Sequence, residues 1–133
     1  MARFECRILV VDDNRDHTDS TALMLHLMGH HVERAYDGEN AIELAKSFAP
    51  DIVLLNLAMP KITGVMVAQA IRQGERGNLV HLVALTGFAR EEDRLLTRAA
   101  GFDAHLVKPV SPDALQQMLQ HWCEKAHGKR GIA

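Results

Sequence analysis

Five polar residues follow predicted strands and could together bind a metal ion and a phosphoryl group: Asp12, Asp13, Asn56, Thr86 and Lys108. Adjacent carboxylates suit a hard cation such as Mg²⁺, which prefers oxygen ligands. A lysine ammonium and a threonine hydroxyl can each donate a hydrogen bond to a phosphoryl oxygen. The set therefore indicates phosphoryl-transfer chemistry, which needs a metal, a positive clamp and a positioned nucleophile.

Apolar runs of strand length alternate five times with segments of helical period. The predicted strands cover residues 6–11, 31–36, 51–55, 79–85 and 104–107. The first, third and fourth are nearly continuous in apolar residues, as strands covered on both faces are. The second contains Glu33 and Arg34, so we expect it at an edge of the sheet. The predicted helices run from Asn14 or Asp16 to Gly29, from after Gly38 to before Pro50, from after Gly64, from about Glu91 to Gly101, and from Ser111 onward.

Repeated strand–helix units predict an α/β fold, in which helices cover both faces of a doubly wound parallel sheet in three layers. Ligands of such sheets bind beyond the carboxyl ends of the strands, where the five polar residues stand. A nucleotide- or flavin-binding domain of this topology needs glycines after the first strand. Residues 12–16 read Asp-Asp-Asn-Arg-Asp instead, so we disfavour that alternative.

Length and composition predict one domain with a proper apolar core, because 47% of the 133 residues are hydrophobic. We expect this domain to cover residues 1–126 and residues 127–133 to form a frayed tail. The net charge of −2 gives no sign of a nucleic-acid groove. We expect no signal peptide and no membrane span, and hence a cytoplasmic protein. Cys6 and Cys123 are interpreted as buried or incidental thiols in a reducing cytosol, without a disulfide.

Four stretches of the chain, in this order, resemble the receiver domain of response regulators. They are residues 8–14, 51–60, 83–87 and 101–109, and Gly64 lies at the family's usual distance beyond Pro60. The resemblance covers nearly the whole chain and implies a flavodoxin-like (βα)5 fold with strand order 2-1-3-4-5. It also implies a phosphorelay switch of two-component signal transduction. The sequence around residues 29–32 and 102–105 is similar to that of receivers attached to hybrid histidine kinases.

The resemblance also implies a role for each polar residue. Asp13 is expected to bind Mg²⁺ directly, Asp12 through water, and Ala58 through its backbone carbonyl. Thr86 is expected to report phosphorylation by turning its hydroxyl toward the phosphoryl group. Lys108 is expected to bridge that group to the acidic pair, with a cis peptide bond between Lys108 and Pro109.

Asn56 departs from the family pattern, because receivers carry their phosphate-accepting aspartate at this place. Neither the oxygen nor the nitrogen of a neutral carboxamide is a competent nucleophile. An intact receiver catalyses its own phosphorylation and dephosphorylation, and Asn56 should abolish both reactions. We therefore expect no enzyme activity. With asparagine in place of aspartate, one negative charge beside the metal position is lost. The electrostatic attraction to Mg²⁺ is thereby reduced by on the order of 4 kcal/mol before solvent relaxation. Mg²⁺ binding should be weakened, although the carbonyl oxygen of Asn56 could still serve as a ligand.

Two explanations of Asn56 stay open. The chain can be a native pseudo-receiver that works as an interaction module without phosphate. It can also carry an introduced change that makes an ordinary receiver non-phosphorylatable. The presence of Asp12, Asp13, Thr86 and Lys108 favours the second explanation. Lys61 and Thr63, where relatives often carry Gly and Asp, favour the first.

The histidines are interpreted mainly as structural residues. His105 stands where receivers usually have Tyr or Phe, the ring that moves on activation. It is predicted either to pack against the fourth helix or, as the sharper alternative, to act as a switch ring that titrates near neutral pH. His26 and His30 have helical ligand spacing, but Gly29 should end the helix between them, which disfavours a metal site.

Expected partners also follow from the resemblance. They are a histidine kinase or a histidine phosphotransfer protein, and a downstream protein that binds the face formed by the fourth helix, fifth strand and fifth helix. No direct partner among nucleic acids or membranes is expected. There is no room for a DNA-binding output domain within 133 residues.

Overall fold

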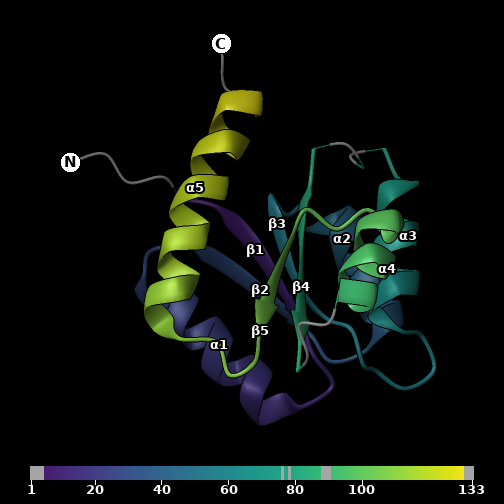
Figure 1. Ribbon diagram of the computed structural model, residues 1–133. Coiled ribbons are helices and arrows are strands. Elements are labelled where there is room, and N and C mark those ends of the chain that lie inside the picture. Colours follow the sequence, from purple (N-terminus) through teal and green to yellow (C-terminus); the bar gives the residue numbers. More distant parts are fainter. Residues whose placement is uncertain (1–4, 76, 78, 88–90, 131–133) are drawn as a thin grey trace.

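The computed structural model describes residues 5–75, 77, 79–87 and 91–130, which form alternating strands and helices (Figure 1). The strands are β1 (Arg7–Val11), β2 (His31–Ala35), β3 (Ile52–Asn56), β4 (His81–Thr86) and β5 (Ala104–Val107). The helices are α1 (Arg15–Leu27), α2 (Gly38–Ser47), α3 (Gly64–Arg72), α4 (Glu91–Ala100) and α5 (Pro112–Arg130). The five predicted strands and five predicted helices are thus all present among these residues.

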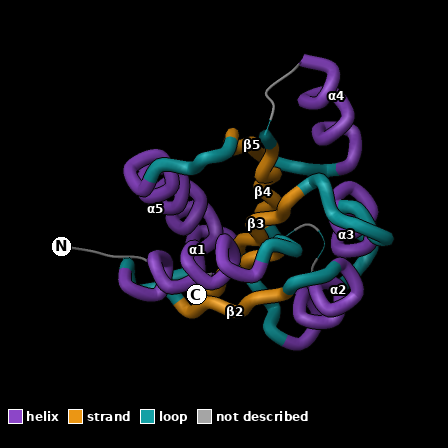
Figure 2. Tube along the Cα trace, turned by 90° about the horizontal axis from the view of Figure 1, so that it is seen from below, coloured by secondary structure: helices purple, strands orange, loops and turns teal. Residues whose placement is uncertain are grey.

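The strands form one parallel sheet in the order β2-β1-β3-β4-β5, which confirms the predicted fold and strand order. The polar strand β2 lies at an edge, as expected. Helices α1 and α5 cover one face of the sheet, and α2, α3 and α4 cover the other (Figure 2). The molecule therefore has three layers, with the sheet buried between the helices.

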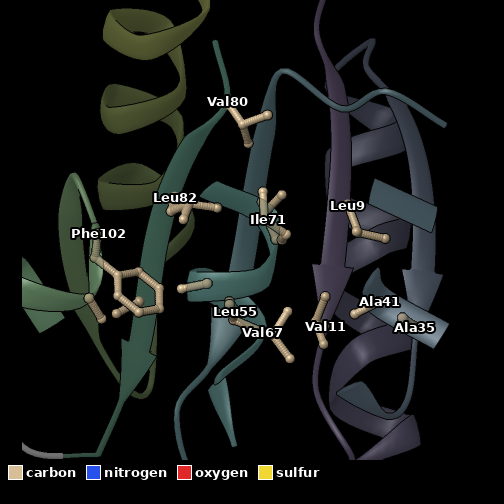
Figure 3. Packing of buried hydrophobic residues seen from close by; sticks show 14 of the residues in the cluster. Leu9, Val11, Ala35, Ala41, Leu55, Val67, Ile71, Val80, Leu82 and Phe102 are labelled. Carbon is tan, nitrogen blue, oxygen red and sulfur yellow. The ribbon is translucent and has the colours of Figure 1, made fainter. Parts of the chain in front are cut away.

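Each face of the sheet carries its own hydrophobic core, because successive side chains of a strand point to opposite faces. Leu9 and Val11 of β1 pack toward α2 and α3 with Val67 and Ile71 (Figure 3). Ile8 and Val10 belong to the core under α1 and α5, with Leu25, Leu115 and Leu119. Strand β3 is buried at all five positions, including Asn56. Such two-sided burial fixes the register of the central strands, since a slip by one residue would exchange the two cores.

Short side chains and glycines fix the ends of the helices. Asn14, Asp37 and Thr63 cap α1, α2 and α3 by accepting hydrogen bonds from backbone N–H groups in the first turn. Gly29 and Gly101 follow the ends of α1 and α4 with φ of 101° and 100°, a conformation that favours glycine. Strand β4 begins at His81, which pairs with Ile52, so the predicted start at Leu79 was two residues early.

Helix α5 continues to Arg130 and thus includes residues 127–130, which were expected to fray. The other part of that expected tail, residues 131–133, lies outside the described residues. No helix in the described part of the chain is both long and apolar enough to cross a membrane.

The prediction of two free thiols was wrong, because Cys6 and Cys123 form a disulfide. Their Cα atoms lie 5.9 Å apart although 117 residues separate them in sequence. Cys6 precedes β1 and Cys123 lies in α5, and both are buried in the core that these elements share. Sequence spacing could not reveal the pair, because packing of the last helix on the first strand brings the two residues together.

Closing so long a loop should stabilise the fold, because it restricts the unfolded chain. We expect the free energy of unfolding, measured by urea titration without reductant, to fall by about 2–4 kcal/mol in Cys123→Ala. In dithiothreitol the difference between the two proteins should shrink to the packing contribution of the lost sulfur atom. If reductant leaves the stability of the unchanged protein unaltered, the disulfide does not contribute in solution.

Candidate functional site

The carboxyl ends of four neighbouring strands place the predicted polar residues at one rim of the sheet. Asp12 and Asp13 follow β1, Asn56 ends β3, Thr86 ends β4 and Lys108 follows β5. Asp12, Asn56 and Thr86 are buried, with 1%, 6% and 8% of their surface exposed. The backbone N–H of Lys108 donates to the carbonyl of Thr86 at 2.8 Å, which joins the ends of β4 and β5. The structure thus brings together all the strand-end residues that the sequence analysis singled out.

Asn56 is the centre of a hydrogen-bond network that joins three of these strand ends. Its Nδ2 donates to the carbonyl of Ala58 at 2.9 Å and to Oδ1 of Asp12 and Oδ1 of Asp13, each at 3.3 Å. Its Oδ1 accepts a hydrogen bond from Nζ of Lys108 at 2.9 Å. Lys108 also donates to Oδ2 of Asp12 at 3.1 Å. Both ends of the carboxamide are therefore engaged.

Asp12 is the buried anion of the site and has several donors around it. Nδ1 of His17 lies 3.0 Å from its Oδ2, and the backbone N–H of Asn14 donates to its Oδ1 at 3.1 Å. Burial raises the pKa of Asp12, but the hydrogen bonds from His17, Asn14 and Lys108 outweigh burial and lower it. Asp12 is therefore charged at neutral pH, as its ion pair with Lys108 requires.

His17 is the residue of this site that the sequence analysis missed. It lies in the first turn of α1, three residues after the capping Asn14. Side chains of a helix lean toward its N-terminus, so a residue in the first turn points back to the strand end from which the helix starts. The place of His17 in the first turn after a strand end was thus the available sequence signal. Only the tertiary contact with Asp12 shows that His17 belongs to the site.

The loop after β3 is held close to the site by Gly64. A Cβ atom at Gly64 would lie 2.5 Å from the backbone oxygen of Asn56 and 2.8 Å from Cα of Leu57, closer than any side chain permits. The N–H of Gly64 donates to the carbonyl of Leu57 at 3.1 Å. Thr63, one of the departures from the family pattern, caps α3 by accepting from the N–H of Met66. On the far side of the site, the Lys108–Pro109 peptide bond is cis, as predicted.

The donor set suits a hard cation by type, since it offers two carboxylates and one backbone carbonyl. Its arrangement does not, because Oδ1 of Asp12, Oδ1 of Asp13 and the carbonyl of Ala58 all accept hydrogen bonds from Asn56. An N–H group cannot ligate a metal, and the carbonyl oxygen of Asn56 faces Lys108 instead of the acidic pair. The residues therefore do not fit Mg²⁺ unless the carboxamide of Asn56 turns.

His105 packs against α4, in agreement with the structural interpretation. It is half-buried in β5, and its Nε2 forms a hydrogen bond with the hydroxyl of Thr97, a buried residue of α4. Burial lowers the pKa of His105, and the positive charges of Arg94 and Arg98 lower it further, against a smaller opposing effect of Asp93. At neutral pH the ring is thus uncharged.

The other histidine cluster is structural. Nδ1 of His30 accepts a hydrogen bond from the N–H of Cys6 at 3.1 Å, and His31 lies 3.4 Å from Glu5. Among the described residues there is no group of three or more His, Cys, Asp or Glu placed to hold a metal ion.

Comparison with known proteins gives consistent matches. Residues 8–120 match the family described as "Response regulator receiver domain". An uncharacterized 14.6 kDa protein of Leptolyngbya boryana is 35% identical over 87% of this chain and 88% of its own length. The transcriptional regulator RpaA of Synechocystis is 33% identical over 82% of this chain, which spans only 45% of that protein.

Among solved structures, the receiver domain of the sensor histidine kinase PA1611 of Pseudomonas aeruginosa is 32% identical, with a TM-score of 0.82. The match covers 90% of this chain and 98% of that one, and that domain was crystallised with a magnesium ion in its active site cleft.

The lowered pKa of His105 predicts a pH-dependent loss of stability. The folded protein holds the proton of His105 less tightly than the unfolded chain does. The contribution of the neutral ring to the free energy of unfolding is therefore complete above the ordinary histidine pKa of about 6.5. It is lost as the pH falls from there through the folded-state pKa. We expect His105→Gln, which keeps a polar partner for Thr97 without titrating, to lose less stability than the unchanged protein between about pH 7.5 and pH 5, measured by urea titration. Parallel stability curves for the two proteins would contradict this assignment.

Proposed function

Because the chain belongs to the response regulator receiver family, we propose that it is a two-component signalling module that binds its partners without taking phosphate at Asn56. Receiver domains of this family occur in response regulators and in sensor histidine kinases. The observation that carries the proposal is the position of Asn56, which ends β3 and contacts Asp12, Asp13 and Lys108. In this place the family resemblance puts the phosphate-accepting aspartate.

The contacts of Asn56 support the absence of phosphorylation. The nucleophile that forms an acyl phosphate in a receiver is a carboxylate, whose two oxygens share a negative charge. Oδ1 of Asn56 is the uncharged oxygen of a carboxamide, and it already accepts from the ammonium of Lys108 at 2.9 Å. Its Nδ2 is delocalised into the carbonyl and donates to three acceptors. Neither atom can form an acyl phosphate, so we propose that the domain is not an enzyme.

The proposed partner surface is the face of α4, β5 and α5. Leu95 and Leu96 of α4 are 61% and 64% exposed, and Val107 at the end of β5 is 42% exposed. Leu95 and Leu96 are neighbours in sequence, and contiguous exposed apolar side chains mark protein-interaction sites more often than single ones do. We propose that a histidine kinase, a phosphotransfer protein or a downstream target binds here in the cytoplasm, with Thr86 turned away from Asn56 as in an inactive receiver.

Both origins of Asn56 are compatible with this proposal. In a native pseudo-receiver, partners bind regardless of phosphodonor. In an ordinary receiver with an introduced asparagine, the phosphate-dependent output is lost, because a ligand shifts an equilibrium only through contacts that differ between the two states. The codon at position 56 in the source genome decides between the two.

Treatment with acetyl phosphate and Mg²⁺ should leave the protein unmodified at position 56. Asn56→Asp supplies the missing carboxylate and should acquire a hydroxylamine-labile phosphate, detected by intact-mass and peptide mass spectrometry. The starting protein must first be shown to be free of deamidated Asn56. A labile phosphate mapped to the peptide of intact Asn56 would overturn the proposal.

Binding to a histidine phosphotransfer protein of the source organism should be equally strong with and without acetyl phosphate. Leu96→Ser on α4 should weaken this binding by about tenfold or more, since burying a leucine contributes about 1.5–3 kcal/mol. Met66→Ser on α3 is the matched control, because Met66 is 50% exposed and belongs to a helix that is not part of the proposed face, and it should bind normally. Binding by the Asn56 protein that depends on phosphodonor would contradict the proposal, as would equal loss in both variants.

A further inference from the structure

Three oxygen atoms from two separate loops converge on one nitrogen atom in this structure. Oδ1 of Asp12 and Oδ1 of Asp13 come from the turn after β1, and the carbonyl of Ala58 comes from the loop after β3. Each lies within 3.3 Å of Nδ2 of Asn56. Oxygen atoms gathered in this way repel one another unless a positively polarised group stands between them. Here that group is the NH₂ of a carboxamide.

The orientation of the carboxamide follows from its neighbours. The ammonium of Lys108 can only donate hydrogen bonds, so the atom of Asn56 that faces it must be the carbonyl oxygen. Ionised carboxylates and a backbone carbonyl can only accept, so the atom that faces them must be the nitrogen. Turning the carboxamide by half a revolution would set an oxygen against three acceptors and an NH₂ against an ammonium. All four contacts would then be unfavourable.

We propose that the carboxamide of Asn56 is a built-in replacement for a divalent cation. Its NH₂ joins the turn after β1 to the loop after β3, and its oxygen extends the connection to Lys108 after β5. The site is therefore held in one arrangement at any Mg²⁺ concentration. This inference rests on the proposed function only in taking Asp12, Asp13 and Ala58 as the metal ligands of the family.

The charges of the site support this replacement. With Asn56, the carboxylates of Asp12 and Asp13 contact the carboxamide and only Asp12 also contacts the ammonium of Lys108, so these three side chains carry a net charge of −1. With aspartate at position 56 the net charge becomes −2, and the NH₂ that separates the oxygens is gone. A third carboxylate in this buried place needs a cation to neutralise it. Asn56→Asp should thus convert a domain that does not respond to Mg²⁺ into one that requires it.

Thermal unfolding in EDTA and in rising concentrations of MgCl₂ tests the proposal. The midpoint of the unchanged protein should be the same in EDTA and in Mg²⁺. The midpoint of Asn56→Asp should lie below it in EDTA and rise by on the order of 5 °C once Mg²⁺ well exceeds its dissociation constant. Gln69→Glu, the same amide-to-acid change at an exposed position of α3, is the matched control and should show no Mg²⁺ response.

Asn56→Leu separates the hydrogen bonds of the carboxamide from the mere filling of space. It can neither donate nor accept, so its midpoint should be lower than that of the unchanged protein in both solutions. If Asn56→Leu is as stable as the unchanged protein, the carboxamide does not hold the loops together and the proposal fails. The proposal also fails if Mg²⁺ raises the midpoint of the unchanged protein as it does that of Asn56→Asp.

The side-chain NH₂ of Asn56 gives a direct readout that does not depend on the folding of any variant. In ¹⁵N-correlated spectra its two protons should exchange slowly with solvent, because they are buried and hydrogen-bonded, and MgCl₂ should not shift them. Loss or displacement of these signals by Mg²⁺ would mean that the ion turns the carboxamide aside, which overturns the proposal. That result would leave the proposed function untouched, because the function is tested by the absence of phosphate at position 56 and by partner binding, and neither readout depends on the direction in which the carboxamide faces.

Discussion

The convergence of acceptor oxygens at the carboxyl rim of the sheet is the constraint on which the site depends. A parallel sheet directs the ends of its strands to one edge, and here that edge receives the carboxylates of Asp12 and Asp13 together with the carbonyl of Ala58. Such a group of oxygens needs a positively polarised partner. Asn56 and Lys108 supply it from β3 and from the end of β5, so that residues far apart in sequence stabilise one another.

The rest of the fold maintains the geometry of this rim. Two-sided burial fixes the register of β1, β3 and β4, and therefore the height at which each polar side chain leaves the sheet. Gly64 lets the start of α3 approach the backbone of Asn56, and the cap of α1 by Asn14 brings His17 against Asp12. The ordinary packing requirements of an α/β domain thus also position a buried ion pair, without any element dedicated to the site alone.

A neutral side chain at the centre of the rim changes what the domain can do as a switch. A receiver that takes phosphate moves between two states because a new charge makes contacts in one state that it lacks in the other. Asn56 contacts Lys108 and both carboxylates within a single arrangement, and the proposed function takes this arrangement as the one that binds partners. The surface of α4 and β5 is still present, with exposed leucines on α4 and His105 packed beneath Thr97. Under the proposed function, the domain binds partners through this surface without being phosphorylated at position 56.

The periodic pattern of the chain determined the order of the elements, the parallel sheet and the residues that reach its rim, because the spacing of apolar residues and the capping residues of helices can be recognised within short stretches of sequence. The polar edge strand and the cis bond before Pro109 followed from the sequence and the family resemblance in the same way. Three features required the tertiary structure: the disulfide of Cys6 and Cys123, the contact of His17 with Asp12, and the direction in which the carboxamide of Asn56 faces. Each depends on which atoms of distant segments meet, and the orientation of an amide is set by the donors and acceptors around it, which no pattern along a single chain contains.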